Sequence, residues 1–323
     1  MLNIKRILVA TDFEWGGEQA LRHAVVLAAE FKAELHVLHI VVGPLHEDRG
    51  VLSFVAMEEL CSRMKQAVRQ YQHLVASSGH VHGILDRYAV RRHVEAAQGI
   101  LDYAADYKID LIVMGTRGRR EARRSVAGST ATRVVRRALC SVLTVGVDNL
   151  FLPGLMKRIL VPVDFSERNV HALTLAKLIA RKTRAQLTLL HVIEPSLYLG
   201  PRPGSFIFSA RRSVRNAYTD LEQFYRYARG PDVSHRYQVV QGRPAQQIIS
   251  TAKQQDAHLI VQGCREDTDT EAFRHGSVAE DIMRQAPCPV LTVRGASPIP
   301  VRGEQQGSQK DQYTPMLRRG IPA

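Results

Sequence analysis

Short apolar runs alternate with helical patterns along most of the chain. The runs, such as residues 7–9 and 111–114, are rich in Val, Ile and Leu and lack a clean alternation of polar and apolar residues. Strands that are buried on both faces have this pattern. Apolar residues spaced three and four apart predict helices between the runs. In the first half of the chain these helices are predicted over residues 17–31, 53–77, 94–107 and 126–138. The alternation predicts a doubly wound α/β fold with a parallel sheet and right-handed crossovers.

The same pattern occurs twice. The sequence KRILV at residues 5–9 recurs at residues 157–161, an offset of 152, and VLTV at residues 142–145 recurs at residues 290–293, an offset of 148. Self-similarity of this kind indicates a tandem duplication. We therefore predict two five-stranded α/β domains, unit 1 (residues 1–147) and unit 2 (residues 157–295). A short linker with Pro153 and Gly154, residues 148–156, joins them.

Composition adds few constraints beyond this. The length of 323 residues suits two domains, and the four cysteines form no CxxC pair, so neither a zinc site nor a disulfide framework is indicated. Residues 296–323 are rich in Ser, Pro, Gly and Gln and are predicted to be a disordered tail. We see no basic-then-apolar leader and no run of 18 apolar residues, so the expected location is the cytoplasm, without a membrane partner.

The net charge of +13 indicates attraction to polyanions, either nucleotide or nucleic acid. No recognised nucleic-acid motif accompanies the charge, which makes nucleic acid the less favoured partner. Five arginines lie close together within residues 117–124. They are interpreted as a solvated basic face or, alternatively, as a phosphate-binding group. These residues are Arg117, Arg119, Arg120, Arg123 and Arg124.

A glycine-rich stretch, VMGTRGRREARRSVAGST at residues 113–130, carries the candidate chemistry. It contains three glycines, Gly115, Gly118 and Gly128, and the last glycine is followed by Ser129 and Thr130. The stretch connects a predicted strand to a predicted helix, so free backbone N–H groups and the helix dipole are available to bind phosphate. The spacing is neither that of the Walker loop nor GxGxxG. The alternative is a flexible surface loop with glycines at its turns.

The spacing G-x2-G-x9-G-[ST] resembles the loop of the ATP-binding subgroup of the universal stress protein family, and the resemblance covers roughly residues 1–295. It implies that the first and fourth strands are neighbours, which brings Asp12 next to the loop at a topological switch point. It also implies that the base and ribose of the nucleotide bind near the end of the first strand and that the glycine loop wraps the phosphates. Mg²⁺ would be held by the phosphates. The implied ATP-binding residues are Ala10, Thr11, Asp12, Ile40, Met114, Gly115, Gly118, Gly128, Ser129 and Thr130.

Some of these residues have structural alternatives. Asp12 may equally cap a helix that starts near Gly16. His39 and His191 occupy matching strand positions and are interpreted as packed, hydrogen-bonded structural residues, and Ile40 belongs to the core in either interpretation.

Unit 2 departs from the pattern. Glu266 occupies the position of the second glycine, and three more carboxylates follow at Asp267, Asp269 and Glu271. This cluster repels a triphosphate, so unit 2 is predicted to have lost ATP binding. Cys264 replaces Thr116 and is expected to be a partly exposed but inert thiol.

A second departure concerns the turn before the third helix. Unit 2 keeps the Gly-x-Pro turn that is usual in the family, at residues 242–244, whereas residues 93–96 of unit 1 lack it. This difference puts one wall of the unit 1 crevice in question.

The last strand of each unit, residues 142–145 and 290–293, is apolar and predicted to lie at a sheet edge. Bare edges pair with other strands. Because the family commonly pairs these strands across a dimer, the two units are expected to form an internal pseudo-dimer. A further homodimer stays open.

The leading functional hypothesis is an ATP-binding regulatory stress protein. Nucleotide in unit 1 would order residues 116–130 for an unidentified protein partner to recognise. No catalytic set is evident, so we expect no efficient enzyme, although slow ATP hydrolysis stays open. One alternative is an interaction protein that binds a partner or RNA through its basic surface. Another is an ATP pyrophosphatase, which would need a Ser/Gly-rich loop where Thr11-Asp12-Phe13-Glu14 stands.

Overall fold

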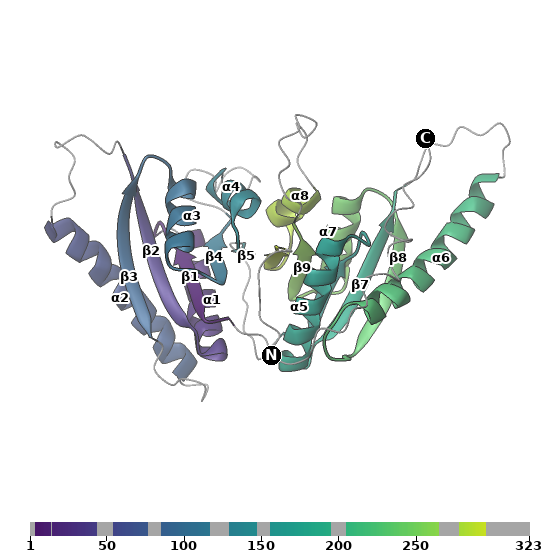
Figure 1. The fold of residues 1–323 in the computed structure, drawn as a ribbon, viewed down its shortest axis with the longest axis horizontal. Coiled ribbons are helices and arrows are strands. Elements are labelled where there is room, and N and C mark those ends of the chain that lie inside the picture. The colour runs from purple at the N-terminus through teal and green to yellow at the C-terminus, as the bar shows by residue number, and fades with distance from the viewer. Residues whose placement is uncertain are drawn as a thin grey trace, which may run out of the picture.

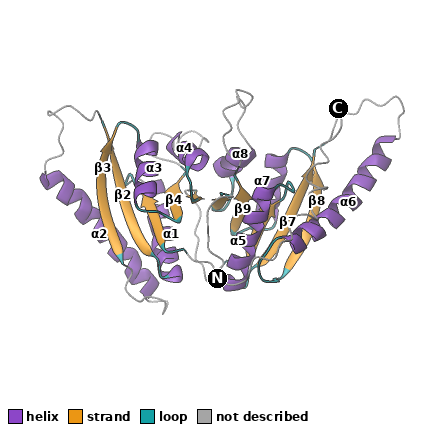
Figure 2. Ribbon diagram, viewed as in Figure 1, coloured by secondary structure: helices purple, strands orange, loops and turns teal. Residues whose placement is uncertain are grey.

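The computed structural model describes residues 4–13, 15–43, 54–76, 85–116, 129–146, 156–194, 205–264 and 278–294. In unit 1 the elements are β1 (Arg6–Ala10), α1 (Trp15–Phe31), β2 (Glu34–Val42), α2 (Phe54–Ala76), β3 (Asp86–His93), α3 (Ala96–Asp106), β4 (Leu111–Gly115), α4 (Ser129–Arg137) and β5 (Ser141–Val145). In unit 2 they are β6 (Arg158–Pro162), α5 (Glu167–Thr183), β7 (Gln186–Ile193), α6 (Ser205–Tyr227), β8 (His235–Gln241), α7 (Pro244–Gln254), β9 (Leu259–Gly263), α8 (Val278–Gln285) and β10 (Val290–Val293). Figures 1 and 2 show the two units side by side.

The two units share one sheet of ten strands, in the order β3-β2-β1-β4-β5-β10-β9-β6-β7-β8. Strands within each unit are parallel, and β5 pairs with β10 in antiparallel fashion, with Leu143 opposite Leu291. The doubly wound α/β fold is confirmed, and so is the pairing of the last strands. Because the pairing uses both of these edges, neither is left bare in the centre of the molecule.

Helices cover both faces of the sheet (Figure 1). One hydrophobic core lies beneath α1, α2, α5 and α6 and continues from unit 1 into unit 2, with residues such as Leu143 and Leu291 in the same cluster. On the opposite face each unit has a core of its own, beneath α3 and α4 in unit 1 and beneath α7 and α8 in unit 2. The side chain of Met283 from α8 joins the unit 1 cluster, so α4 and α8 are in contact across the junction.

Where they can be compared, the predicted helix bounds of unit 1 differ from the observed ones by at most two residues. The helix predicted over residues 94–107 spans Ala96–Asp106, since Glu95 is extended, with φ −140° and ψ 125°. The described part of the helix predicted over residues 126–138 is Ser129–Arg137. The linker up to residue 155, the tail and residues 117–128 of the glycine loop lie outside the described residues.

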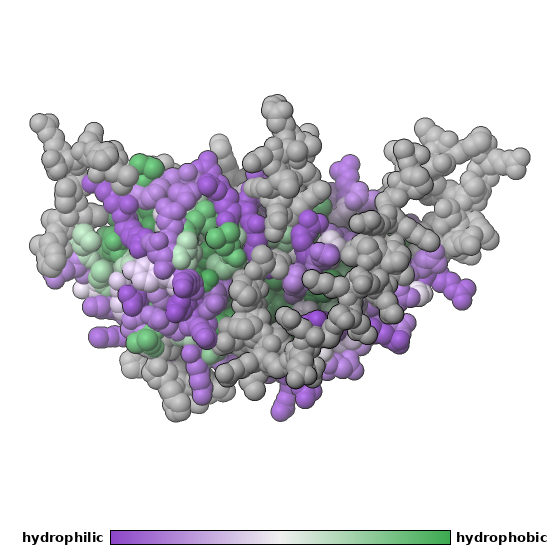
Figure 3. All heavy atoms as spheres, in the orientation of Figure 1, coloured by the Kyte–Doolittle hydropathy of each residue, from purple (hydrophilic) through white to green (hydrophobic). Residues whose placement is uncertain are grey.

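Hydrophilic residues dominate the described surface on the face drawn in Figure 3, with hydrophobic patches over unit 1. Among the described helices, none combines the length and the apolar character that crossing a membrane requires.

Candidate functional site

Strands β1 and β4 lie side by side at the centre of unit 1, and Ala10 is opposite Met114 in their register. The chain leaves β1 for α1, which packs on one face of the sheet, and leaves β4 toward α4, which packs on the other. Such a switch point opens a crevice beyond the carboxyl ends of the two strands. Asp12 follows β1 and Gly115 ends β4, so the predicted juxtaposition of these two positions is confirmed.

Three of the predicted nucleotide-contacting side chains lie on the same face as α3 and α4. Ala10 and Ile40 are half-buried against the unit 1 cluster, and Met114 is buried within it, only 4% exposed. Ile40 also approaches α3, because a Cβ added at Gly99 would lie 3.0 Å from its Cδ1. These residues form an apolar wall at the crevice, in which Ala10 and Ile40 keep exposed surface and Met114 belongs to the core.

In each unit a histidine holds the turn after the first strand, β1 or β6. His39 Nδ1 lies 2.8 Å from the carbonyl oxygen of Thr11, and His191 Nδ1 lies 2.8 Å from that of Val163. A carbonyl only accepts, so Nδ1 is the protonated nitrogen in each ring. The residue after the equivalent aspartates Asp12 and Asp164 is Phe13 or Phe165, which has a φ near +60° and contacts the ring of that histidine. The structural interpretation of both histidines is confirmed.

Thr11 and Asp12 lie over the first turn of α1. A Cβ added at Gly17 would come within 2.7 Å of Asp12 Oδ1 and 2.8 Å of Thr11 Oγ1. Thr11 Oγ1 also accepts a hydrogen bond from the Phe13 N–H, at 3.0 Å. Asp12 therefore lies beside the first turn of α1, at the same edge of the sheet as Gly115, a place that fits both the capping and the nucleotide-binding interpretation.

Close backbone packing requires a glycine at the first glycine position of the loop. A Cβ added at Gly115 would lie 2.5 Å from the carbonyl oxygen of Gly16, and one at the equivalent Gly263 would lie 3.0 Å from the backbone of Arg168. Both units keep this glycine, since the first turn of α1 or α5 packs directly on the end of the strand. Gly115 alone therefore does not indicate a phosphate site, and the other residues of the motif have to do so.

The remainder of that motif is partly described. Ser129 is exposed and Thr130 half-buried at the start of α4, the position expected of hydroxyl donors to a phosphate. Gly118 and Gly128 lie outside the described residues, as do the five loop arginines and the carboxylates at 266–271.

Unit 2 has a buried, hydrogen-bonded side chain at the equivalent place, which the sequence interpretation missed. Asn169 stands where unit 1 has Gly17 and is 7% exposed. Its Nδ2 donates to Asp164 Oδ1, and its Oδ1 accepts from the Gly263 N–H at 3.3 Å. One amide thus joins the aspartate after β6 to the backbone that ends β9. Comparing the two units at an offset of 152 reveals this difference in the sequence itself.

Asp164 is further occupied by its own turn. It accepts hydrogen bonds from Ser166 N at 2.9 Å and Ser166 Oγ at 2.5 Å. Burial would raise the pKa of this carboxyl, but the hydrogen bonds from Ser166 and Asn169 and the nearby charge of Arg168 outweigh it, so the pKa lies below its usual range. In unit 2, Oδ1 of this aspartate is therefore held by its own turn and by Asn169, while the side chain as a whole stays 59% exposed.

A second replacement in unit 2 alters the apolar wall. Gln262 stands at the position of Met114, is buried, and donates from Nε2 to the Ala279 carbonyl at 3.1 Å and to Thr292 Oγ1 at 3.2 Å. A buried amide needs such partners. Gln262 therefore ties the end of β9 to α8 and β10.

The turn before α3 forms without Gly-x-Pro. His93 Nδ1 accepts a hydrogen bond from the Glu95 N–H at 3.0 Å, and Glu95 Oε1 forms an ion pair with Arg133 Nη1 at 2.5 Å. In unit 2 the same turn uses Gly242, with φ +141°, and Pro244 in the first turn of α7. The turn before α3 therefore forms in unit 1 without the Gly and Pro. It is supported by His93 and by Arg133 of α4, two residues that the sequence interpretation missed.

The expectation that Cys264 is partly exposed is wrong. The residue is 6% exposed, and its Sγ lies 3.7 Å from the carbonyl oxygen of Val135 in α4. The end of β9 faces unit 1 across the junction, so the thiol lies against α4 of the other unit. Within the described ranges, no group of three or more His, Cys, Asp or Glu residues is arranged to hold a metal ion.

Comparison with known proteins settles the family. The model of the universal stress protein family (Usp) matches residues 3–146 and again residues 156–294. The chain belongs to the universal stress protein family. A universal stress protein of Mycolicibacterium smegmatis is 26% identical over 297 residues, which cover 89% of this chain and 96% of that protein. One of Methanocaldococcus jannaschii is 30% identical over 142 residues, which cover 44% of this chain and 84% of that protein.

A solved structure supports the fold of the whole chain. The crystal structure of a universal stress protein from Archaeoglobus fulgidus matches with a TM-score of 0.64 and 18% identity, and the match covers 90% of this chain and 98% of that one. At this identity the match shows the fold alone. This universal stress protein thus has two family domains, and their crevices differ in the residues described above.

Proposed function

We propose that unit 1 of this universal stress protein binds ATP with Mg²⁺ and that unit 2 does not, so that the chain acts as a nucleotide-responsive regulatory protein. The observation that carries the proposal is the contrast between Gly17 and Asn169 at equivalent positions. Asn169 joins Asp164 to the Gly263 N–H in unit 2. Gly17 has no side chain with which to make that bridge.

The described residues of unit 1 offer surfaces suited to each part of a nucleotide. The apolar wall of Ala10 and Ile40 suits a base, and the Asp12 carboxylate is an acceptor for ribose hydroxyls. The start of α4, with Ser129 and Thr130, offers hydroxyl donors and the positive end of a helix dipole to phosphates. Magnesium bound to the phosphates would reduce their charge and keep most of its water ligands.

The proposed output passes through α4. This helix follows the glycine loop and is joined to the α3 turn by the Glu95–Arg133 ion pair. A ligand that binds the ordered loop more tightly than the open one shifts the population toward order. An acidic protein partner could then recognise the ordered loop, which carries the five arginines. We propose binding rather than catalysis, since the crevice residues described form no nucleophile–base pair.

Calorimetry with ATP and Mg²⁺ tests the site. The wild-type chain is expected to bind about one ATP, and both Gly118→Glu and Gly17→Asn are expected to abolish binding by copying unit 2 into unit 1. The matched control is Glu266→Gln in unit 2, which should leave one site per chain. Absence of binding by the wild type, or two equivalent sites per chain, would contradict the proposal.

A second candidate function rests on the net charge of +13. If the wild type binds no nucleotide, the basic surface is the remaining feature, and the chain would act as a non-nucleotide interaction protein. A mobility shift with single-stranded RNA at increasing salt distinguishes this candidate, because binding through phosphate contacts weakens steeply with salt.

A further inference from the structure

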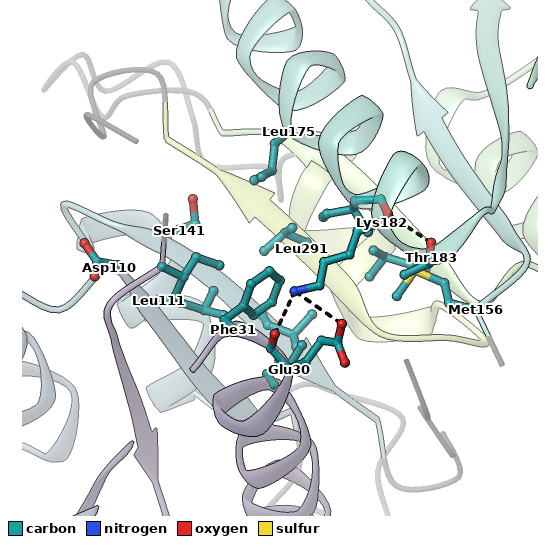
Figure 4. Close-up of a pocket in the computed structure, with 15 residues that line it drawn as sticks. Glu30, Phe31, Asp110, Leu111, Ser141, Met156, Leu175, Lys182, Thr183 and Leu291 are labelled. Carbon is teal, nitrogen blue, oxygen red and sulfur yellow. Dashed lines mark hydrogen bonds and ion pairs between the residues drawn. The ribbon is translucent and has the colours of Figure 1, made fainter. Parts of the chain in front are cut away.

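Equivalent residues of the two units face each other across the junction. The offsets of 152 and 148 relate twelve of the fifteen residues that line a small apolar pocket of about 50 Å³ as six pairs (Figure 4). The apolar pairs are Ile4 with Met156, Leu27 with Ile179, Leu111 with Leu259, and Leu143 with Leu291. The junction therefore has an approximate twofold symmetry, as a dimer of two identical units would have.

One polar pair at this pocket breaks the symmetry. Glu30 of α1 and Lys182 of α5 are equivalent positions with opposite charge. Lys182 Nζ lies 3.2 Å from Glu30 Oε1, donates to the Glu30 carbonyl at 2.7 Å, and lies 4.5 Å from the centre of the Phe31 ring (Figure 4). The residue equivalent to Phe31 is Thr183, so only unit 1 provides the ring.

A second asymmetric contact joins α4 and α8. Arg136 of α4 forms an ion pair with Glu280 of α8, whose side chain is 4% exposed. Arg284, the equivalent of Arg136, lies 3.9 Å from the other oxygen of the same carboxylate. The position equivalent to Glu280 is Thr132, so one carboxylate from unit 2 serves two equivalent arginines.

A third asymmetric contact lies near the C-terminal end of α4. Arg294 Nη2 donates to the carbonyl of Val135 at 3.2 Å, near the C-terminal end of the helix, where a cation is favourable. The position equivalent to Arg294 is Gly146, which has no side chain to reach α8 in return.

We infer that the junction surface of unit 1 is specific for unit 2 and closed to a second unit 1. A like pair of unit 1 would bring two Glu30 carboxylates together and would leave Arg136 opposite Thr132, without a carboxylate. A like pair of unit 2 would bring two Lys182 ammonium groups together. Partner choice is thus specified by repulsion between like units as well as by attraction between unlike ones. Unit 2 is the dedicated partner of unit 1, and this inference holds whether or not unit 1 binds nucleotide.

Thiol cross-linking of the full chain tests which units meet. Glu30→Cys, Lys182→Cys and the double variant are made with Cys61→Ser, since Cys61 is the partly exposed thiol among the four. After treatment with a short bismaleimide, the double variant should give a cross-linked monomer, and neither single variant should give a covalent dimer. A covalent dimer of either single variant, or a double variant that fails to cross-link, overturns the inference.

Charge reversal provides an independent measurement. Lys182→Glu should lower the Tm by about 2–4 °C, because two carboxylates then face each other. The double reversal Glu30→Lys with Lys182→Glu should recover most of that loss. Lys253→Glu, at an exposed position of α7 away from the junction, is the control and should change the Tm by less than about 1 °C. A double reversal no more stable than Lys182→Glu contradicts the inference.

Discussion

At the scale of single residues, Gly115 is the loop position whose role changes most once the structure is known. The sequence pattern assigns it to a nucleotide loop, whereas its backbone packs against Gly16 so closely that an added Cβ would lie 2.5 Å from a carbonyl oxygen. A contact with backbone cannot be relieved by a rotamer change. The equivalent contact at Gly263 is looser, at 3.0 Å.

Alanine substitutions at three glycines test this packing. Gly115→Ala is expected to lower the free energy of unfolding by about 2–3 kcal/mol, and Gly263→Ala by roughly 1 kcal/mol, since overpacking strains the backbone. Gly43→Ala is the control, because its nearest neighbour is the end of the Arg92 side chain at 3.4 Å. Urea unfolding measures all three. Equal losses at Gly115 and Gly43 would contradict the structural role.

His23 makes the stability of unit 1 depend on pH. It is fully buried in α1, and burial lowers its pKa to about 4, although its hydrogen bond to the Gln19 carbonyl opposes this shift. The unfolded chain, with a pKa near 6.5, binds more protons between these values, so stability is fully present above about pH 6.5 and falls as the pH approaches 4. The pKa difference amounts to about 3 kcal/mol. Buried His36 and partly buried His258, whose pKa values are also lowered, change stability in the same direction.

The equivalent residue in unit 2, Leu175, suggests the variant that tests this effect. His23→Leu should flatten the decline in unfolding free energy between pH 7 and pH 4.5, measured by urea titration at each pH. A decline as steep as that of the wild type would show that other groups cause it.

The residue-scale findings also show what the sequence could predict. The structural roles of His39 and His191 were predictable, because each lies at a matching position in a duplicated strand. The difference between Gly17 and Asn169 is visible at the same offset of 152, but the bridge from Asn169 to Gly263 depends on the packing of α5 against β9. The contact of Cys264 with α4 was not predictable from either unit alone, because it joins residues of different units.

At the scale of elements, helix α4 contacts both the turn before α3 in unit 1 and residues of unit 2. Its first turn carries Ser129 and Thr130, its middle is paired with Glu95 through Arg133, and its last turn is held by residues of unit 2. The pattern of apolar residues predicted this helix and the other helices of unit 1 to within a few residues. The contacts at its end could not be predicted, because they depend on which strand edges pair.

Arg294 should therefore affect nucleotide binding from a distance. Arg294→Met removes a cation and a donor from the C-terminal end of α4, a change of about 0.3–1 kcal/mol in the stability of the ordered helix. If ATP requires the ordered helix, its affinity should fall by about two- to fivefold. Arg226→Met, which removes an exposed cation paired within α6, is the control. Calorimetry gives the affinities, and hydrogen exchange at α4 should rise for Arg294→Met. Unchanged exchange would show that Arg294 does not hold the helix.

At the scale of the whole molecule, the single sheet and the continuous core predict one cooperative unit. The core beneath α1 and α5 runs across the junction, and Leu143 and Leu291 lie opposite each other on β5 and β10. Two domains that share a core lose stability together when the shared part is disrupted. The tandem organisation and the pairing of last strands were predictable from repeated sequence and apolar edges. The merging of two cores into one depends on junction packing that no single repeat contains.

Cys140 and Cys288 are matched reporters of unfolding in the two units. They occupy equivalent positions, both are buried, and burial raises the pKa of each thiol to about 12. Each thiol should therefore react only when its own unit opens. Thiol labelling across a urea series, read by mass spectrometry, should give coincident transitions for the wild type. Leu291→Ala should move both transitions to lower urea by the same amount, a loss of about 2–5 kcal/mol.

Nucleotide makes that test more discriminating, because ATP is proposed to bind unit 1 alone. At a concentration of about 100 times its Kd, ATP stabilises the folded state by about 2.7 kcal/mol. In a single cooperative molecule this protection must extend to Cys288, which lies in the unit that does not bind. Protection of Cys140 alone would show that the units unfold separately despite the shared sheet. Equal protection of both thiols, lost in Gly118→Glu, would show that binding in unit 1 stabilises unit 2 through the junction.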